Sequence, residues 1–185
     1  MKKITVQLDP SIHLTRKPKG QEEYRPLAGR VAFGCNPVIL TPQEFTKMVS
    51  EQGVPFFSSS FYQPEKEDYW RLRNYPGKVY YRCTHLFALD FDEQDFNFRE
   101  AVEMVVRSME EFDPICIYHS FSSTPQHNRL RVVYHCDEPF TPYDEHKERV
   151  KYLNVKYFKG QADKRCITPV KFWQGSTRGG FCFAL

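Results

Sequence analysis

Residues 86–92 constrain the fold more than any other stretch of the chain. They are apolar as far as Leu89 and then carry Asp90, Phe91 and Asp92. A short continuous apolar run of this kind predicts a strand buried in a sheet. Side chains alternate along a strand, so Asp90 and Asp92 are expected on one face, with Cα atoms about 6–7 Å apart. Their mutual repulsion has to be offset by solvent, a cation or a basic partner.

These two carboxylates are candidate metal ligands. Paired carboxylates can hold two divalent ions about 3.5–4 Å from each other, an arrangement that suits phosphate chemistry. The sequence therefore indicates a metal site at Asp90 and Asp92 that acts on nucleotides. Asp163, between a predicted helix and a predicted strand, is a candidate third ligand. The alternative for all three is a solvated residue at the end of a strand or in a turn.

Arg129 and Arg131 form a second pair, also two residues apart on a predicted strand and therefore on one face. If this strand lies near the acidic one, the two guanidinium groups face the acids across a pocket. Arginine suits bidentate contact with phosphate, so a triphosphate would lie between the metals and the arginines. The competing interpretation is two ordinary salt bridges with Asp90 and Asp92.

The segment before these arginines is rich in small hydroxyl side chains. Hydroxyls and main-chain N–H groups in such a turn can hold phosphate oxygens, although the same residues fill ordinary turns. His127 lies nearby, and a lone histidine is more often structural or solvated than catalytic. The candidate phosphate-binding residues here are Ser120, Ser122, Ser123 and Thr124.

Residues 64–75 interleave Arg71 and Arg73 with three aromatic side chains. Basic residues between aromatic ones suit a path for single-stranded nucleic acid, because bases stack and phosphates pair with the cations. A solvated loop or hairpin with a few packed rings explains the same pattern.

The order of the predicted elements favours an α+β fold, with helices packed on a mixed or antiparallel sheet. Helices are predicted to start at Thr41, at Asn97 and at Thr141, each followed three residues later by an acid. A stripe of apolar residues extends the second helix as far as residues 113–114, where Asp113 and Pro114 are expected to end it. That stripe comprises Phe98, Val102, Val105, Met109 and Phe112.

The bulk properties fit one domain over residues 1–185, with residues 1–40 as an N-terminal strand and loop extension. Within the extension, the polar residues 9–26 are expected to run over the surface. No apolar run approaches the roughly 20 residues of a membrane span, so no membrane partner is expected. The charged start and six cysteines without a Cys-x-x-Cys pair predict a reduced cytoplasmic protein. The neighbours Cys83 and His85, like His135 and Cys136, match no structural zinc spacing.

The order of these motifs resembles the archaeo-eukaryotic primase superfamily, in particular the primase-polymerase domains of plasmid and phage replication proteins. The likeness extends from about residue 40 onward. Residues 86–92 resemble the family's strand ending in Asp-x-Asp, and residues 120–133 resemble its Ser/Thr-Pro turn followed by a basic strand. Residues 160–176, which include Asp163 and Lys171, resemble a third block with an acid and a later basic residue.

The resemblance implies an RNA-recognition-like (RRM-like) fold and a DNA primase or polymerase with two Mg²⁺ or Mn²⁺ ions on Asp90, Asp92 and Asp163. The implied partners are a DNA template and nucleoside triphosphates. The resemblance also allows a helicase domain or protein as a further partner. The incoming triphosphate would contact the block from Ser120 to Arg131, and Lys171 would assist. Two departures stand out: Arg131 occupies about the place of the family's Ser-x-His histidine, and Lys171 replaces an arginine.

Two other functions fit parts of the sequence. A non-catalytic DNA-binding domain of a replication initiator would use the basic and aromatic residues without turnover. A phosphatase of the haloacid-dehalogenase type also begins with Asp-x-Asp on a strand. That class places Thr or Val two residues after the acids, where this chain has Gln94.

Overall fold

The computed structural model describes residues 2–64, 76–92 and 97–183. Arg71, Arg73 and Gln94 lie outside these residues. The helices are α1 (Gly20–Phe33), α2 (Pro42–Ser50), α3 (Phe98–Ser108) and α4 (Tyr143–Phe158), with 3-10 turns at Lys78–Tyr80 and Lys164–Ile167. The strands are β1 (Ile4–Leu8), β2 (Val38–Leu40), β3 (Phe56–Phe57), β4 (Ser59–Phe61), β5 (Tyr81–Phe91), β6 (Asp113–His119), β7 (Leu130–Phe140), β8 (Phe172–Trp173) and β9 (Gly180–Cys182).

A five-stranded antiparallel sheet, in the order β4-β5-β7-β6-β9, forms the centre of the molecule. Residues 86–91 of the predicted strand form the second half of β5, with Leu86, Ala88 and Leu89 buried, and Asp92 follows directly after the strand. The strand predicted to carry Arg131 is β7, and it pairs with β6, which precedes residues 120–129. The expectation of an α+β fold with an antiparallel sheet is confirmed.

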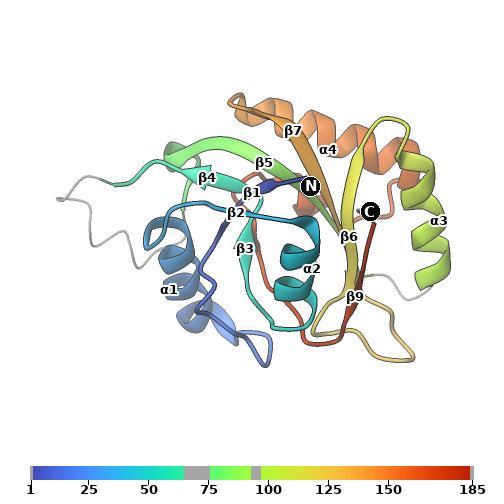
Figure 1. The fold of residues 1–185 in the computed structure, drawn as a ribbon, viewed down its shortest axis with the longest axis horizontal. Coiled ribbons are helices and arrows are strands. Elements are labelled where there is room, and N and C mark those ends of the chain that lie inside the picture. Colours follow the sequence, from blue (N-terminus) through green and yellow to red (C-terminus); the bar gives the residue numbers. More distant parts are fainter. Residues whose placement is uncertain (1, 65–75, 93–96, 184–185) are drawn as a thin grey trace.

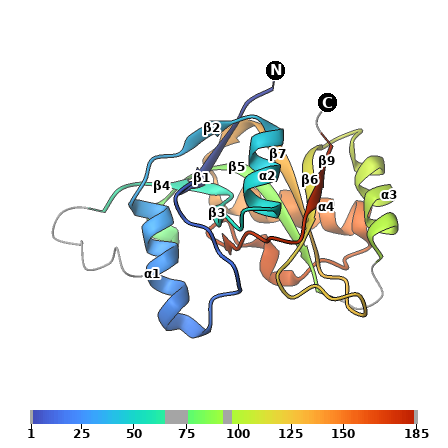
Figure 2. The ribbon, with the colours of Figure 1, turned by 60° about the horizontal axis from the view of Figure 1, so that its bottom comes forward.

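Helices cover both faces of this sheet. Helices α3 and α4 lie on one side, and α1 and α2 lie on the other together with a four-stranded antiparallel sheet in the order β2-β1-β3-β8 (Figure 1; Figure 2). The chain passes directly from β3 of one sheet to β4 of the other through Ser58, whose carbonyl accepts hydrogen bonds from His85 and Leu86 of β5. The two sheets are therefore joined by main chain at this point.

Two of the three predicted helix starts have the expected caps. The Thr41 hydroxyl accepts a hydrogen bond from the Glu44 N–H, and the Glu44 carboxylate accepts one from the Thr41 N–H, which completes a capping box. Asn97 caps α3 through the Glu100 N–H. At α4 the capping position is Pro142, which has no side chain able to bond, so Thr141 does not cap that helix.

Residues 9–26 do not run as a surface loop throughout, because α1 begins at Gly20. The helix contains Pro26, and its first turn carries Glu22 and Glu23, which made this part look polar in the sequence. Its second half buries Val31 and other apolar residues against the strand segments around Phe57 and Phe172. Tertiary packing therefore stabilises a helix that its local sequence does not indicate.

The predicted end of the second helix was also wrong. Helix α3 ends at Ser108, and Asp113 and Pro114 are the first two residues of β6. Met109, predicted to lie on the buried stripe, follows the helix and is 51% exposed. Val105 is buried as predicted, with Ala101 and Met104 beside it on the packed face. The other predicted residues of the stripe, Phe98, Val102 and Phe112, pack against the core.

The repeated Thr-Pro motif gives a matched test of helix capping. We expect Thr41→Ala to lower the free energy of unfolding by about 1 kcal/mol, because the Glu44 N–H loses the hydroxyl that accepts its hydrogen bond. Thr141→Ala is the control, since Thr141 is exposed and does not cap α4. Urea denaturation of both variants measures the difference, and equal stabilities would contradict this account of α2.

Candidate functional site

Three carboxylates, from Asp90, Asp92 and Asp163, lie together where β5 ends; we call them the acidic cluster. One ligand atom from each lies within 4.8 Å of the others. Main-chain contacts place Asp163, which is distant in sequence: its N–H donates to the Asp90 carbonyl at 2.8 Å. The Asp90 N–H in turn donates to the Cys166 sulfur at 3.1 Å. Burial raises the pKa of Cys166 to about 12, so this thiol stays neutral beside the carboxylates.

Asp90 forms a buried ion pair with Arg131, directly opposite on β7. The Arg131 Nε donates to Asp90 Oδ1 at 3.0 Å, and the two side chains are only 10% and 8% exposed. The Nη1 group donates to the Gln174 carbonyl, and the guanidinium lies over the Trp173 ring, 5.7 Å from its centroid. Arg131 is therefore held by groups from two segments, β5 and the residues of and after β8, and fixes Asp90 in place.

Three further cations lie against the acidic cluster. Lys171 Nζ is 3.6 Å from Asp90 Oδ2 and 4.3 Å from the centroid of the Trp173 ring. Arg165 pairs with Asp163 at 2.6 Å, and its side chain is 79% exposed. Arg129 Nη1 lies 3.8 Å from Asp92 Oδ1, one residue before β7 rather than within it as predicted. The salt bridges weighed as the alternative for Arg129 and Arg131 are thus present.

The neighbouring cations keep Asp90 and Asp163 ionised. Burial opposes a charge on Asp90, but the Arg131 guanidinium and the Lys171 ammonium outweigh it and lower the pKa of Asp90 from 3.8. Burial likewise opposes a charge on Asp163, and hydrogen bonds from Arg165 lower its pKa overall. Each carboxylate oxygen has two lone pairs, so the cluster retains oxygen donors for a hard divalent cation. The three carboxylates could therefore hold a metal ion.

A cavity of about 490 Å³ opens onto the acidic cluster. Sequence reasoning missed the part of its lining that comes from α1 and the residues before it, because those residues carry no motif and meet the acids only through the fold. Arg165, two residues after Asp163, could have been found from its position. The lining residues are Lys17, Pro18, Gly20, Gln21, Tyr24, Asp90, Asp92, Arg131, Asp163, Arg165, Thr168, Lys171, Phe172 and Gln174.

The predicted phosphate-binding turn does not line this cavity. Ser123 and Thr124 line a separate cavity of about 220 Å³ together with His119 and Arg178. The Ser123 hydroxyl accepts a hydrogen bond from the Arg129 N–H at 3.2 Å. The turn is further closed by a Ser120 N–H to Arg129 carbonyl bond and by main-chain bonds between Thr124 and His127. Ser122 is half-buried in the same turn.

Comparison of the chain with family models, curated proteins and solved structures found no match. Among the helices that the structure describes, none is both long enough and apolar enough to span a membrane.

The buried ion pair predicts an asymmetric response to substitution. Asp90→Asn leaves Arg131 charged without its partner, and we expect the free energy of unfolding to fall by about 3–5 kcal/mol. Adding Arg131→Met should recover part of the loss. Asp92→Asn is the control: it removes an acid from a more exposed pair and should cost less than about 1 kcal/mol. Urea denaturation in EDTA measures all three, and a stable Asp90→Asn variant would contradict the pairing.

The lowered pKa of Asp90 also predicts a dependence of stability on pH. Because the native carboxyl releases its proton at a lower pH than the unfolded one, its contribution is complete above about pH 4 and is lost as the pH falls through the native pKa. Between about pH 5 and pH 2, wild type should lose more stability than Asp90→Asn. Thermal melts across this range test the prediction, and parallel curves would refute it.

Proposed function

We propose that the protein transfers nucleotides onto a DNA template as a metal-dependent primase or polymerase. The observation that carries the proposal is the acidic cluster, whose three carboxylates meet at one side of a cavity that also carries cationic side chains. Acids beside cations in one cavity suit a metal-bound triphosphate, since the acids hold the metals and the cations pair with phosphate oxygens.

Each part of the cavity has a distinct role in this mechanism. Asp90, Asp92 and Asp163 would hold the divalent ions, which when bound activate the attacking hydroxyl and stabilise the leaving pyrophosphate. Arg165 and Lys171 are placed to contact phosphate oxygens, because both line the cavity beside the acids. Arg131 acts as a positioning residue, since its nitrogens are taken up by Asp90 and the Gln174 carbonyl.

The topology is compatible with an RRM-like primase core. Along the chain, β5 is followed by α3, β6, β7 and α4. In the sheet, β7 lies between β5 and β6. This is the strand order of a split β-α-β unit. The position on the other side of β5 is occupied by β4, which precedes β5 in the chain.

A primer-extension assay tests the proposed activity. Full-length protein, a primed DNA template, nucleoside triphosphates and Mn²⁺ or Mg²⁺ should give extended products. Asp92→Asn and Asp163→Asn should reduce the rate by about 100-fold or more, equivalent to about 2.7 kcal/mol of lost transition-state stabilisation. Asp144→Asn, an exposed acid on α4 away from the cavity, is the matched control and should retain full activity.

Two outcomes would overturn the proposal. One is the lack of any extension or primer synthesis by wild type with either metal. The other is full activity in both Asp92→Asn and Asp163→Asn. DNA binding that weakens with salt but is indifferent to metal and to Asp92→Asn would instead support a non-catalytic initiator domain.

A further inference from the structure

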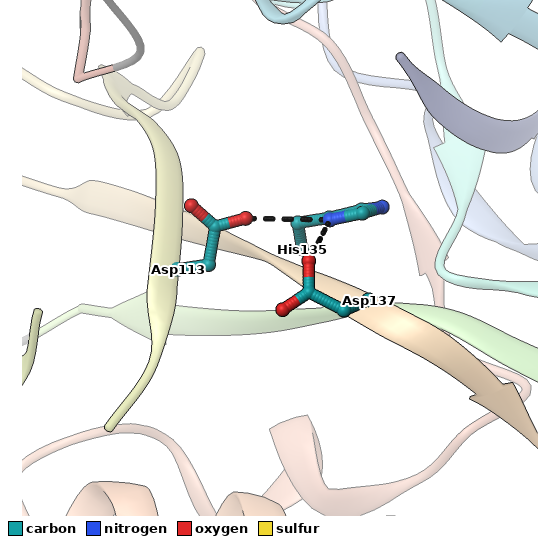
Figure 3. Close-up of side chains that lie close together, drawn as sticks. All are labelled: Asp113, His135 and Asp137. Carbon is teal, nitrogen blue, oxygen red and sulfur yellow. Dashed lines mark hydrogen bonds and ion pairs between the residues drawn. The ribbon is translucent and has the colours of Figure 1, made fainter. Parts of the chain in front are cut away.

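A second group of potential metal ligands lies away from the acidic cluster, on β6 and β7. Asp113 is the first residue of β6 and lies directly opposite His135 in the pairing with β7. Asp137 follows His135 by two residues on β7. Both carboxylates approach the same imidazole nitrogen: His135 Nδ1 is 3.3 Å from Asp113 Oδ2 and 3.1 Å from Asp137 Oδ1 (Figure 3). We call these three residues the histidine cluster.

The donors of the histidine cluster differ in kind from those of the acidic cluster. One imidazole nitrogen and two carboxylates offer ligand atoms within 4.8 Å of one another, carried by paired strands. Imidazole suits zinc and related transition metals, whereas an all-carboxylate set suits Mg²⁺ or Mn²⁺. We propose that Asp113, His135 and Asp137 form a second metal site, which takes a divalent transition metal such as Zn²⁺.

The surroundings of the histidine cluster favour a cation. The Lys2 ammonium contacts Asp113 and lies 3.8 Å from Asp137, so the chain itself already places a positive charge between the two carboxylates. A third acid, Glu138, lines the adjoining cavity of about 550 Å³. That cavity gives an ion and its water access to the three side chains, and three protein ligands with one open position is a known arrangement for zinc. A bound metal would displace Lys2 and any proton on His135 Nδ1.

The site is independent of the proposed polymerase activity. His135 lies four residues along β7 from Arg131, a separation of about 13 Å. The lining residues of the 550 Å³ cavity include none of those that line the cavity at the acidic cluster. The two sites can therefore be tested separately in the full chain.

Zinc titration by calorimetry, with cobalt absorption as a second readout, tests this proposal. We expect wild type and Asp92→Asn to bind Zn²⁺ at the histidine cluster, and Co²⁺ to give visible bands there. His135→Ala and Asp137→Asn should each weaken this binding by more than about 10-fold. Removal of a hydrogen-bond partner of a ligand already weakens metal binding by about that much, and these variants remove a ligand itself. Lys2→Met should strengthen it, because a competing cation is removed.

Glu138→Gln is the matched control, since it removes one negative charge from the same strand without removing a ligand. Its zinc affinity should fall far less than that of the two ligand variants, because it loses a nearby charge and no ligand atom. The His135→Ala variant keeps all six cysteines, so zinc held by thiols would persist in it. Asp137 is 79% exposed, so we expect Asp137→Asn to fold as wild type does, and circular dichroism tests this. Unchanged zinc stoichiometry and affinity in both ligand variants would overturn the proposal.

Discussion

The ion pair between Asp90 and Arg131 is the interaction on which the rest of the candidate site depends. Both groups are buried, and desolvation of two charges is unfavourable unless each is closely paired and hydrogen-bonded. The pairing across β5 and β7 meets the first condition, and the Gln174 carbonyl helps to meet the second. Because Gln174 follows β8, the pair links the central sheet to the layer that covers it. The cavity forms where these two layers meet.

The sequence was sufficient for the features that depend on local pattern. The apolar run before Asp90 predicted a buried strand, and the alternation of side chains correctly put Asp90 and Arg131 on faces that meet. Apolar periodicity likewise identified Val105 as part of the buried side of α3. In each case one face of an element is buried, so the spacing of apolar residues carries the information.

Features that depend on long-range contact could not be predicted in this way. Helix α1 is stabilised by contacts with β3 and β8 segments that are distant in the chain, and its polar first turn concealed it. The turn that contains Ser123 was expected to hold the triphosphate because of its small hydroxyl side chains and because residues 120–133 resemble a phosphate-binding block. In the fold, the main-chain bonds of this turn direct it to a different cavity. Adjacency along a strand therefore did not determine which cavity a loop lines.

The main-chain hydrogen bond between Asp163 and Asp90 has a consequence for how this site can change over time. Because the bond joins an N–H and a carbonyl, most substitutions at position 163 leave it intact. The main chain of a histidine, asparagine or glutamate at this position would be held beside Asp90 by the same bond. The main-chain bond thus sets the position of residue 163, whereas its side chain sets the kind of ligand that is offered. Single substitutions at position 163 would therefore change which metal the proposed site could hold, while this main-chain bond stays in place.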